Sequence, residues 1–158
     1  MNELLSELFS SKVRAAVLSY MLPRPQAAVS LTEFSRLLGL PISSLQHECY
    51  KLERIGLIKA RREGNSRRYR INPTCLILPE LTALVARALG PTQILAASLD
   101  GVTGLEVAFI GCAIPLDRDT LTETPIPLVL IGEVPLEEID AAVERVATQL
   151  SVPTSKIE

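Results

Sequence analysis

The sequence predicts an α+β protein built from two modules, and three observations support this prediction. In the first half, apolar residues at helical spacing give way to an alternating segment that is typical of a β-hairpin. The second half shows two apolar runs of strand length followed by an amphipathic helix. The charges divide in the same way: residues 1–73 hold 12 Lys and Arg against 6 Asp and Glu, whereas residues 74–158 hold 4 against 12. The expected boundaries are 1–73 for the basic module, 74–90 for a connecting helix and 91–158 for the acidic module.

The composition excludes several classes of protein. Of the 158 residues, 47% are apolar and 22% are charged, which indicates a folded core and argues against disorder. The longest apolar runs, such as Leu128–Ile131, are far shorter than the ~20 residues that span a bilayer, and no export signal opens the chain. The three cysteines, Cys49, Cys75 and Cys112, are odd in number and far apart, which excludes a disulfide framework and a CxxC motif. We therefore expect a cytoplasmic protein that does not bind a membrane.

Three helices are expected in the basic module. Residues 3–22 carry apolar side chains at helical spacing, and prolines follow them. Thr32 is a candidate N-cap for a short second helix that ends at Gly39. Ser43 is a candidate N-cap for a third helix, which stops at Gly56. Three short helices joined by tight turns are typical of a helix-turn-helix.

A β-hairpin is expected directly after the third helix. Turn-forming residues in Glu63–Ser66 separate two segments of alternating pattern. Because side chains alternate across a strand, Tyr69 and Ile71 share one face, and Arg68 and Arg70 share the other. A hairpin in this position predicts the wing of a winged helix-turn-helix.

The basic residues cluster on the third helix and the hairpin. Half of the 16 Lys and Arg residues lie within residues 51–70. A solvated charged surface would explain this run alone, but the order of helices and hairpin favours binding to duplex DNA, whose phosphates attract clustered cations. The stripe Leu45, Cys49 and Leu52 is expected to face the core, so the opposite side of the helix is free to meet DNA, and Gln46 can pair with adenine. The expected DNA-contacting residues are Ser43, Ser44, Gln46, His47, Tyr50, Lys51, Arg54, Arg61, Arg62, Arg67, Arg68 and Arg70.

The two DNA-binding elements have different expected roles. Residues 43–55 are expected to read the major groove as a recognition helix, and residues 57–72 to contact the backbone or the minor groove. His47 and Cys49 are two positions apart on a helix and point to different faces. A metal site is therefore not expected.

Three fragments of the basic module carry a resemblance to a known family. They are Leu8–Arg14 (LFSSKVR), Leu52–Ile58 (LERIGLI) and Tyr69–Pro73 (YRINP). Together they resemble the winged helix-turn-helix repressors of the arsenic-resistance and multiple-antibiotic-resistance types. The resemblance covers residues 1–73 and implies a homodimer that binds a palindromic DNA site.

The acidic module has a second resemblance. Apolar runs at Leu105–Gly111 and Ile126–Gly132 flank a polar loop, and an amphipathic helix follows. Over roughly residues 76–152 this outline is similar to the minimal nucleotidyltransferase domain. In that family a Gly-Ser pair follows the first strand, and two Asp residues at the second strand hold two Mg²⁺ ions.

The chain departs from the nucleotidyltransferase pattern at the positions that carry the chemistry. Cys112 stands where the family has Ser, and Pro125 and Pro127 stand at the two Asp positions. We therefore expect a degenerate nucleotidyltransferase-like module without catalytic residues, cofactor or metal, which serves dimerisation, a protein partner or a small ligand. One alternative is an active nucleotidyltransferase that uses Asp117 or Asp119. Another is an antitoxin-like adaptor that binds a partner and uses DNA binding only for autoregulation.

The segment between the modules also predicts a helix. Pro79–Leu89 places Leu81, Leu84, Val85 and Ala88 on one side. This stripe is either a dimer seam or a face that packs on its own module, and the sequence leaves both open.

Overall fold

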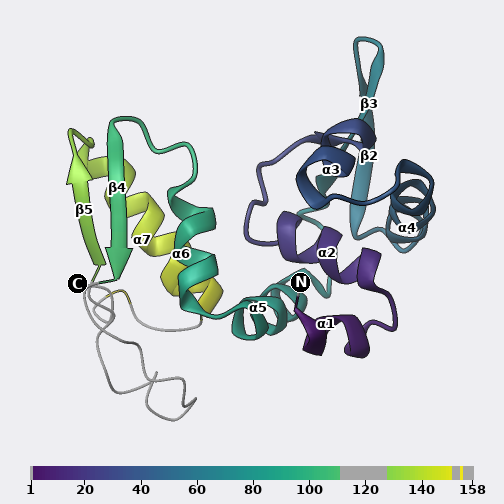
Figure 1. The fold of residues 1–158 in the computed structure, drawn as a ribbon, viewed down its shortest axis with the longest axis horizontal. Helices are drawn as coiled ribbons and strands as arrows, with labels where there is room; N and C mark the ends of the chain where they lie inside the picture. Colours follow the sequence, from purple (N-terminus) through teal and green to yellow (C-terminus); the bar gives the residue numbers. More distant parts are fainter. Residues whose placement is uncertain (1, 111–127, 151–153, 155–158) are drawn as a thin grey trace. The chain divides into compact units, whose positions relative to one another are not determined.

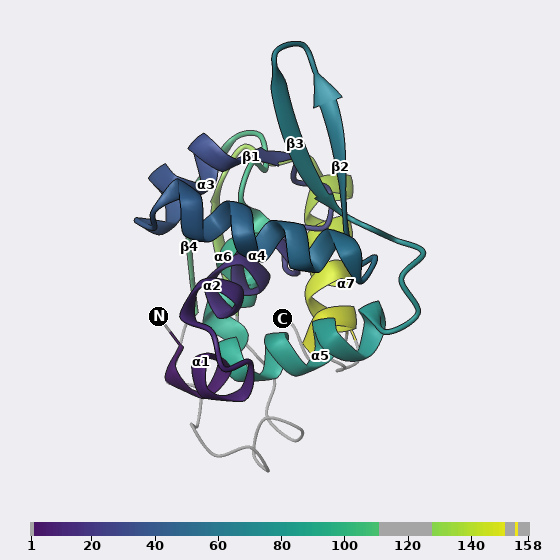
Figure 2. The ribbon, with the colours of Figure 1, turned by 90° about the vertical axis from the view of Figure 1, so that its right-hand side faces the viewer.

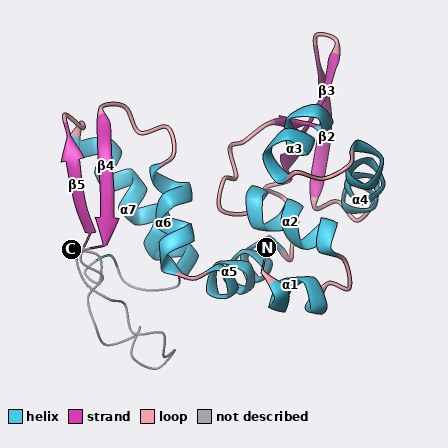
Figure 3. Ribbon diagram, viewed as in Figure 1, coloured by secondary structure: helices cyan, strands magenta, loops and turns pink. Residues whose placement is uncertain are grey.

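A computed structural model describes residues 2–110, 128–150 and 154. The described residues form seven α-helices and two small antiparallel sheets, which makes the protein α+β (Figure 1, Figure 3). The chain divides into two compact units, Met1–Leu89 and Gly90–Glu158. Within the described ranges, no helix combines the length and the apolar character needed to cross a membrane.

The first unit opens with two helices where the sequence pattern suggested one. Helix α1 (Glu3–Leu8) and helix α2 (Lys12–Met21) are separated by a turn in which Ser10 has a positive φ of 49°. The Ser11 hydroxyl accepts a hydrogen bond from the Arg14 amide and caps α2. The apolar spacing continues across this turn, which is why periodicity alone did not reveal the break.

Helix α3 (Leu31–Leu38) begins two residues earlier than expected. Its N-cap is Ser30, which forms a capping box with Glu33, whereas Thr32 lies inside the first turn. Gly39 closes the helix in the left-handed conformation with a φ of 66°, as the sequence predicted.

Helix α4 (Ile42–Arg54) follows α3 after a three-residue turn. Its N-cap is Pro41, and no side chain caps its first amides, so the expected N-cap Ser43 lies within the helix instead. Gly56, just beyond the C-terminus, has the predicted positive φ of 76°. The structure thus contains both helices expected in this segment, α3 and α4, joined by a short turn.

The sheet of the first unit contains the predicted hairpin and one additional short strand. Strands β2 (Ile58–Glu63) and β3 (Ser66–Ile71) pair antiparallel around a turn that contains Gly64, which has a positive φ. Strand β1 (Val29–Ser30) pairs with β3 on the other side, which gives the order β1-β3-β2. The free end of the hairpin extends beyond α4 (Figure 2).

One hydrophobic core joins the helices and the sheet of this unit. Phe34 from α3 is fully buried in it. Helix α5 (Leu78–Leu89) contributes Val85 to the same core, and the Asn2 side chain donates a hydrogen bond to the Ala88 carbonyl at 2.6 Å. The segment expected as a connecting helix therefore packs on its own unit, while Leu84 stays 41% exposed.

The second unit packs two helices together beside a two-stranded sheet. Helices α6 and α7 contact each other, and Arg145 of α7 donates a hydrogen bond to the Ser98 carbonyl at 3.1 Å. The two strands pair antiparallel and agree with the predicted apolar runs. Cys112, Asp117, Asp119, Pro125 and Pro127 lie outside the described residues. The elements are α6 (Pro91–Leu99), β4 (Leu105–Ile110), β5 (Leu128–Gly132) and α7 (Leu136–Leu150).

Candidate nucleic-acid interface

Helix α4 has an apolar face and an exposed polar face. Leu45, Cys49 and Leu52 are at most 2% exposed and form part of the core, as their spacing predicted. Gln46 and His47 are exposed on the other side, as is Tyr50 at 60%. The polar side of α4 is thus available to a macromolecular partner.

The register of the hairpin divides its arginines between two faces. Ala60 opposes Tyr69, and the next pair on that face, toward the free end, is Arg62 opposite Arg67. Since Tyr69 is buried and Arg67 reaches α4, this face is the one that adjoins the helix. The opposite face carries the cross-strand pairs Lys59–Arg70 and Arg61–Arg68.

A hollow of about 360 Å³ lies between α4 and β3. It brings together four residues of α4 that the sequence analysis proposed and one arginine of the hairpin. It also includes Glu53 and Tyr69, which the sequence analysis did not propose as contacts. Glu53 follows Gln46 and Tyr50 at helical spacing, so extending the exposed stripe of α4 by one turn would have found it. The lining residues are Ser43, Gln46, His47, Tyr50, Glu53, Arg67 and Tyr69.

Arg67 is held at the edge of this hollow by two contacts. Its Nη2 donates to Oε2 of Glu53 at 2.6 Å. Its guanidinium carbon also lies 5.7 Å from the centre of the Tyr69 ring, within the range of a cation–π contact. The positive charge of Arg67 is therefore compensated by a carboxylate on α4.

Arg68 is bound within the protein. Its guanidinium donates to the Ala28 carbonyl at 2.7 Å and to Glu33 of α3 at 3.1 Å, and its Nε lies 3.6 Å from Glu63. The Ser30 amide and hydroxyl, which hydrogen-bond the Glu33 carboxylate, together with the charge of Arg68, lower the pKa of Glu33. Arg68 thus ties β3 to α3, which is a structural task in addition to the DNA contact expected from the sequence.

A buried carboxylate on α4 connects the helix to α2. Glu48 is 6% exposed and accepts hydrogen bonds from Arg14 at 2.9 Å and from Lys51 at 3.0 Å. Arg14 also donates to the Phe9 carbonyl at 3.2 Å. Burial by itself would raise the pKa of Glu48, but the hydrogen bonds and charges of Lys51 and Arg14 outweigh it, and the pKa is lowered. Glu48 therefore remains ionised and fixes the position of α4.

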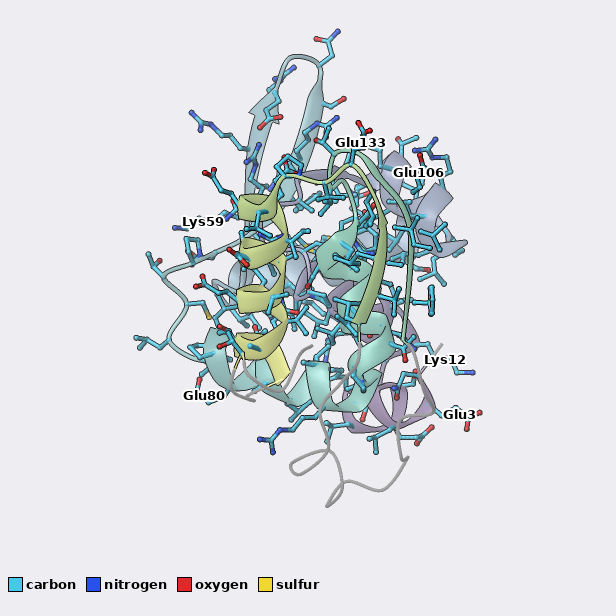
Figure 4. All side chains as sticks on the ribbon, turned by 90° about the vertical axis from the view of Figure 1, so that its left-hand side faces the viewer. Glu3, Lys12, Lys59, Glu80, Glu106 and Glu133 are labelled. Atoms are coloured by element: carbon cyan, nitrogen blue, oxygen red, sulfur yellow. The ribbon has the colours of Figure 1, made fainter. Side chains whose placement is uncertain are left out.

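Four basic residues of the cluster keep exposed charges. Arg54, Lys59, Arg61 and Arg62 are exposed, and within the described part of the chain they have no ion-pair partner. Arg70, by contrast, pairs with Glu63 at 3.0 Å. Nitrogen-tipped side chains project from the hairpin, with Lys59 near its base (Figure 4).

Cys49 is buried and does not belong to the exposed surface of α4 and the hairpin. Burial, followed by the nearby charges of Glu48 and Glu53, raises the pKa of the Cys49 thiol to about 12. Because the thiolate is the reactive form, the Cys49 side chain is chemically inert at neutral pH. His47 is exposed on the other face of the helix, as the spacing of the two residues predicted.

Comparison of the chain with protein-family models, with curated proteins and with solved structures gave no match. Function is therefore inferred from the geometry of α4 and the hairpin.

Proposed function

We propose that the first unit is a winged helix-turn-helix that binds duplex DNA sequence-specifically, and that the protein is a transcription regulator. The recognition helix α4 enters the major groove, and the hairpin contacts the backbone or the minor groove as a wing. The observation that carries the proposal is the exposed polar face of α4 next to the Arg62-bearing face of the hairpin.

The dimensions of α4 suit a major groove. Its 13 residues form a rod about 20 Å long and about 10–12 Å across with side chains, and the groove is about 12 Å wide. Gln46 and His47 lie exposed in the N-terminal half, where recognition helices contact base edges. The first amides of α4 have no side-chain cap, so Ser43 and its neighbours can donate hydrogen bonds to a phosphate.

The uncompensated cations supply the non-specific part of the affinity. Arg62 lies on the same face of the hairpin as the hollow and is placed to contact a phosphate beside α4. Lys59 and Arg61 lie on the opposite face and add positive potential that attracts DNA at longer range. Arg54, at the end of α4, extends the basic surface along the helix.

The primary test is binding of labelled duplexes, measured by fluorescence anisotropy over a series of salt concentrations. Sites are first selected from random or genomic DNA. Arg62→Ala should weaken binding to selected and random duplexes alike and reduce the slope of log K against log salt by about 0.9. Arg87→Ala is the matched control, because Arg87 is an exposed arginine on α5 of the same unit. Equal slopes for wild type and Arg62→Ala would contradict the proposed placement of the wing.

We further propose that the protein is a homodimer. Exposed leucines on α1 and α5 support this: Leu4 and Leu8 are 55% and 57% exposed, and Leu84 is 41% exposed. The two helices contact each other, so these side chains belong to neighbouring elements of one unit. Leu8→Glu should shift the protein from dimer to monomer in sedimentation velocity, whereas Leu37→Glu, at an exposed leucine of α3, should not. An unchanged mass for Leu8→Glu would place the dimer interface elsewhere.

For the second unit we propose a non-catalytic role in dimerisation or in binding a partner or ligand. The cross-strand pairs Val107–Ile131 and Phe109–Val129 lie on one face of its sheet, and their side chains are 38–49% exposed. An apolar face of this kind supports a binding role. Mg²⁺ with labelled nucleotide should give no transfer to protein or RNA, and no Mg²⁺-dependent heat of nucleotide binding in calorimetry. Transfer would assign the protein to the nucleotidyltransferases instead.

A further inference from the structure

The carboxylate of Glu53 lies on the surface that is proposed to contact DNA. Glu53 lines the hollow between α4 and β3, together with side chains expected to contact bases. Its side chain is 29% exposed, so water and a bound polyanion can both reach it. A negative charge in this place opposes the binding of phosphates. The presence of Glu53 at this position therefore has to be explained.

The ion pair between Glu53 and Arg67 contributes too little to the stability of the fold to explain why a carboxylate occupies this position. The Arg67 side chain is 60% exposed, and exposed ion pairs contribute little to folding because water screens them. The buried core beneath the pair is apolar and already joins α4 to the hairpin through Cys49, Tyr69 and their neighbours. The main consequence of the Glu53–Arg67 pair is thus electrostatic.

The two arginines on this face of the hairpin differ in their partners. Arg62 and Arg67 are cross-strand neighbours on the face that adjoins α4. Arg67 is bound to Glu53 at 2.6 Å, whereas Arg62 has no ion-pair partner among the described residues. One cation beside the hollow is therefore free to bind a phosphate, and the other is neutralised.

We propose that Glu53 withholds Arg67 from the DNA backbone and so limits the non-specific, salt-dependent part of DNA binding. This inference rests on the proposed DNA-binding function. A DNA phosphate near the hollow has to compete with the Glu53 carboxylate for the same guanidinium. Neutralising Arg67 lowers the affinity for every duplex equally and leaves the base contacts of Gln46 and His47 unchanged. Base contacts therefore supply a larger share of the binding free energy, while the ratio of specific to non-specific affinity is unchanged.

The test compares four variants on a random-sequence duplex over a series of salt concentrations. Glu53→Gln should steepen the slope of log K against log salt by about 0.9. Between 1 M and 0.1 M salt, the affinity of this variant should therefore rise by about eight times the factor by which the wild-type affinity rises. The double variant Glu53→Gln with Arg67→Gln should return to the wild-type slope. The ion pair has no net charge, and neither do the two glutamines that replace it. Arg62→Gln should make the slope shallower by about 0.9.

Glu63→Gln is the matched control for net charge. Glu63 lies on the same hairpin and pairs with Arg68 and Arg70 of the opposite face. This variant should change the slope by less than half as much as Glu53→Gln. On a selected site, Glu53→Gln should gain affinity by the same factor as on random DNA, because the base contacts of Gln46 and His47 do not change.

Two results would overturn the inference. Equal steepening by Glu53→Gln and Glu63→Gln would show an effect of net charge alone. A double variant as shallow as Arg62→Gln would show that Arg67 already contacts phosphate in the wild type. Failure of the proposed function looks different: the wild-type protein would then bind no duplex at any salt concentration. Urea unfolding of each variant verifies that the fold is retained.

Discussion

Removing the buried carboxylate on α4 should both destabilise the first unit and weaken DNA binding. Glu48→Ala deletes the acceptor of two short hydrogen bonds, from Arg14 and from Lys51. It also leaves the Arg14 guanidinium without the anion that joins α2 to α4. Because α4 is the proposed recognition helix, a loosened α4 should lose affinity for selected and random DNA alike.

The magnitude follows from the exposure of the partners. Breaking a fully buried ion pair costs about 3–5 kcal/mol. The side chains of Arg14 and Lys51 are 30% and 36% exposed, so water solvates them again when Glu48 is absent. We therefore expect a loss of about 2 kcal/mol, between the buried value and the ~0–1 kcal/mol of an exposed pair. For a unit of this size the midpoint of thermal unfolding should fall by about 8–16 °C.

The same residue should make stability depend on pH. The pKa of Glu48 is lowered in the folded protein, so its contribution is complete above the unfolded-state value, near 4.5. As the pH falls below that value and through the folded-state pKa, the carboxylate is protonated and its contribution is lost. Glu48→Gln should flatten this acid-side decline, and the remaining decline includes Glu33, whose pKa is also lowered.

Urea unfolding followed by circular dichroism, at neutral pH and at several values below 4.5, measures the loss of stability and its dependence on pH. Glu53→Ala is the control, because its exposed pair on the same helix should contribute no more than about 1 kcal/mol. If Glu48→Ala and Glu53→Ala destabilise the protein equally, the buried pair does not hold α4 in place. An acid-side decline that Glu48→Gln leaves unchanged would refute the electrostatic argument.

Further predictions concern the hairpin, the recognition helix and the thiols. Arg68→Ala should destabilise the protein by about 1–2 kcal/mol in urea unfolding, because it loses bonds to a carbonyl and to carboxylates, whereas Arg61→Ala should stay within about 0.5 kcal/mol. Gln46→Ala should relax the preference at one base position by about 1–3 kcal/mol and leave the affinity for random duplex nearly unchanged, as measured by competition binding. A loss that is equal for both duplexes would show that α4 does not read bases through this residue. Alkylation at neutral pH with peptide mapping should label the half-buried Cys75 before Cys49, which should react only after unfolding. Rapid labelling of Cys49 in the folded protein would contradict its burial.

Local patterns were sufficient to predict much of the fold. The stripe Leu45, Cys49 and Leu52 identified the buried face of α4, because residues three and four apart meet on one side of a helix. Glycine at 39 and 56 identified the helix ends, since only glycine adopts a positive φ without steric cost. Alternation likewise predicted the hairpin and the side on which Tyr69 lies.

Where the local sequence allowed more than one structure, only the folded chain showed which one forms. Thr32 and Ser30 are both acceptable N-caps by residue type, and the cap is Ser30, at the end of a strand that pairs with β3. Apolar spacing that continues through Ser10 concealed the turn between α1 and α2. The sequence left open whether the helix after the hairpin forms a dimer seam or packs on its own module, and Val85 lies in the core of the first unit.

The sequence by itself determined that the basic residues gather on one helix and one hairpin, because composition and periodicity are local properties. Only the tertiary structure decided which of them keep their charge uncompensated. The hydrogen-bond partners of Arg67 and Arg68 lie 14 to 40 positions away along the chain. Ion pairs over such separations depend on how α3, α4 and the sheet pack together, and no local pattern encodes that packing.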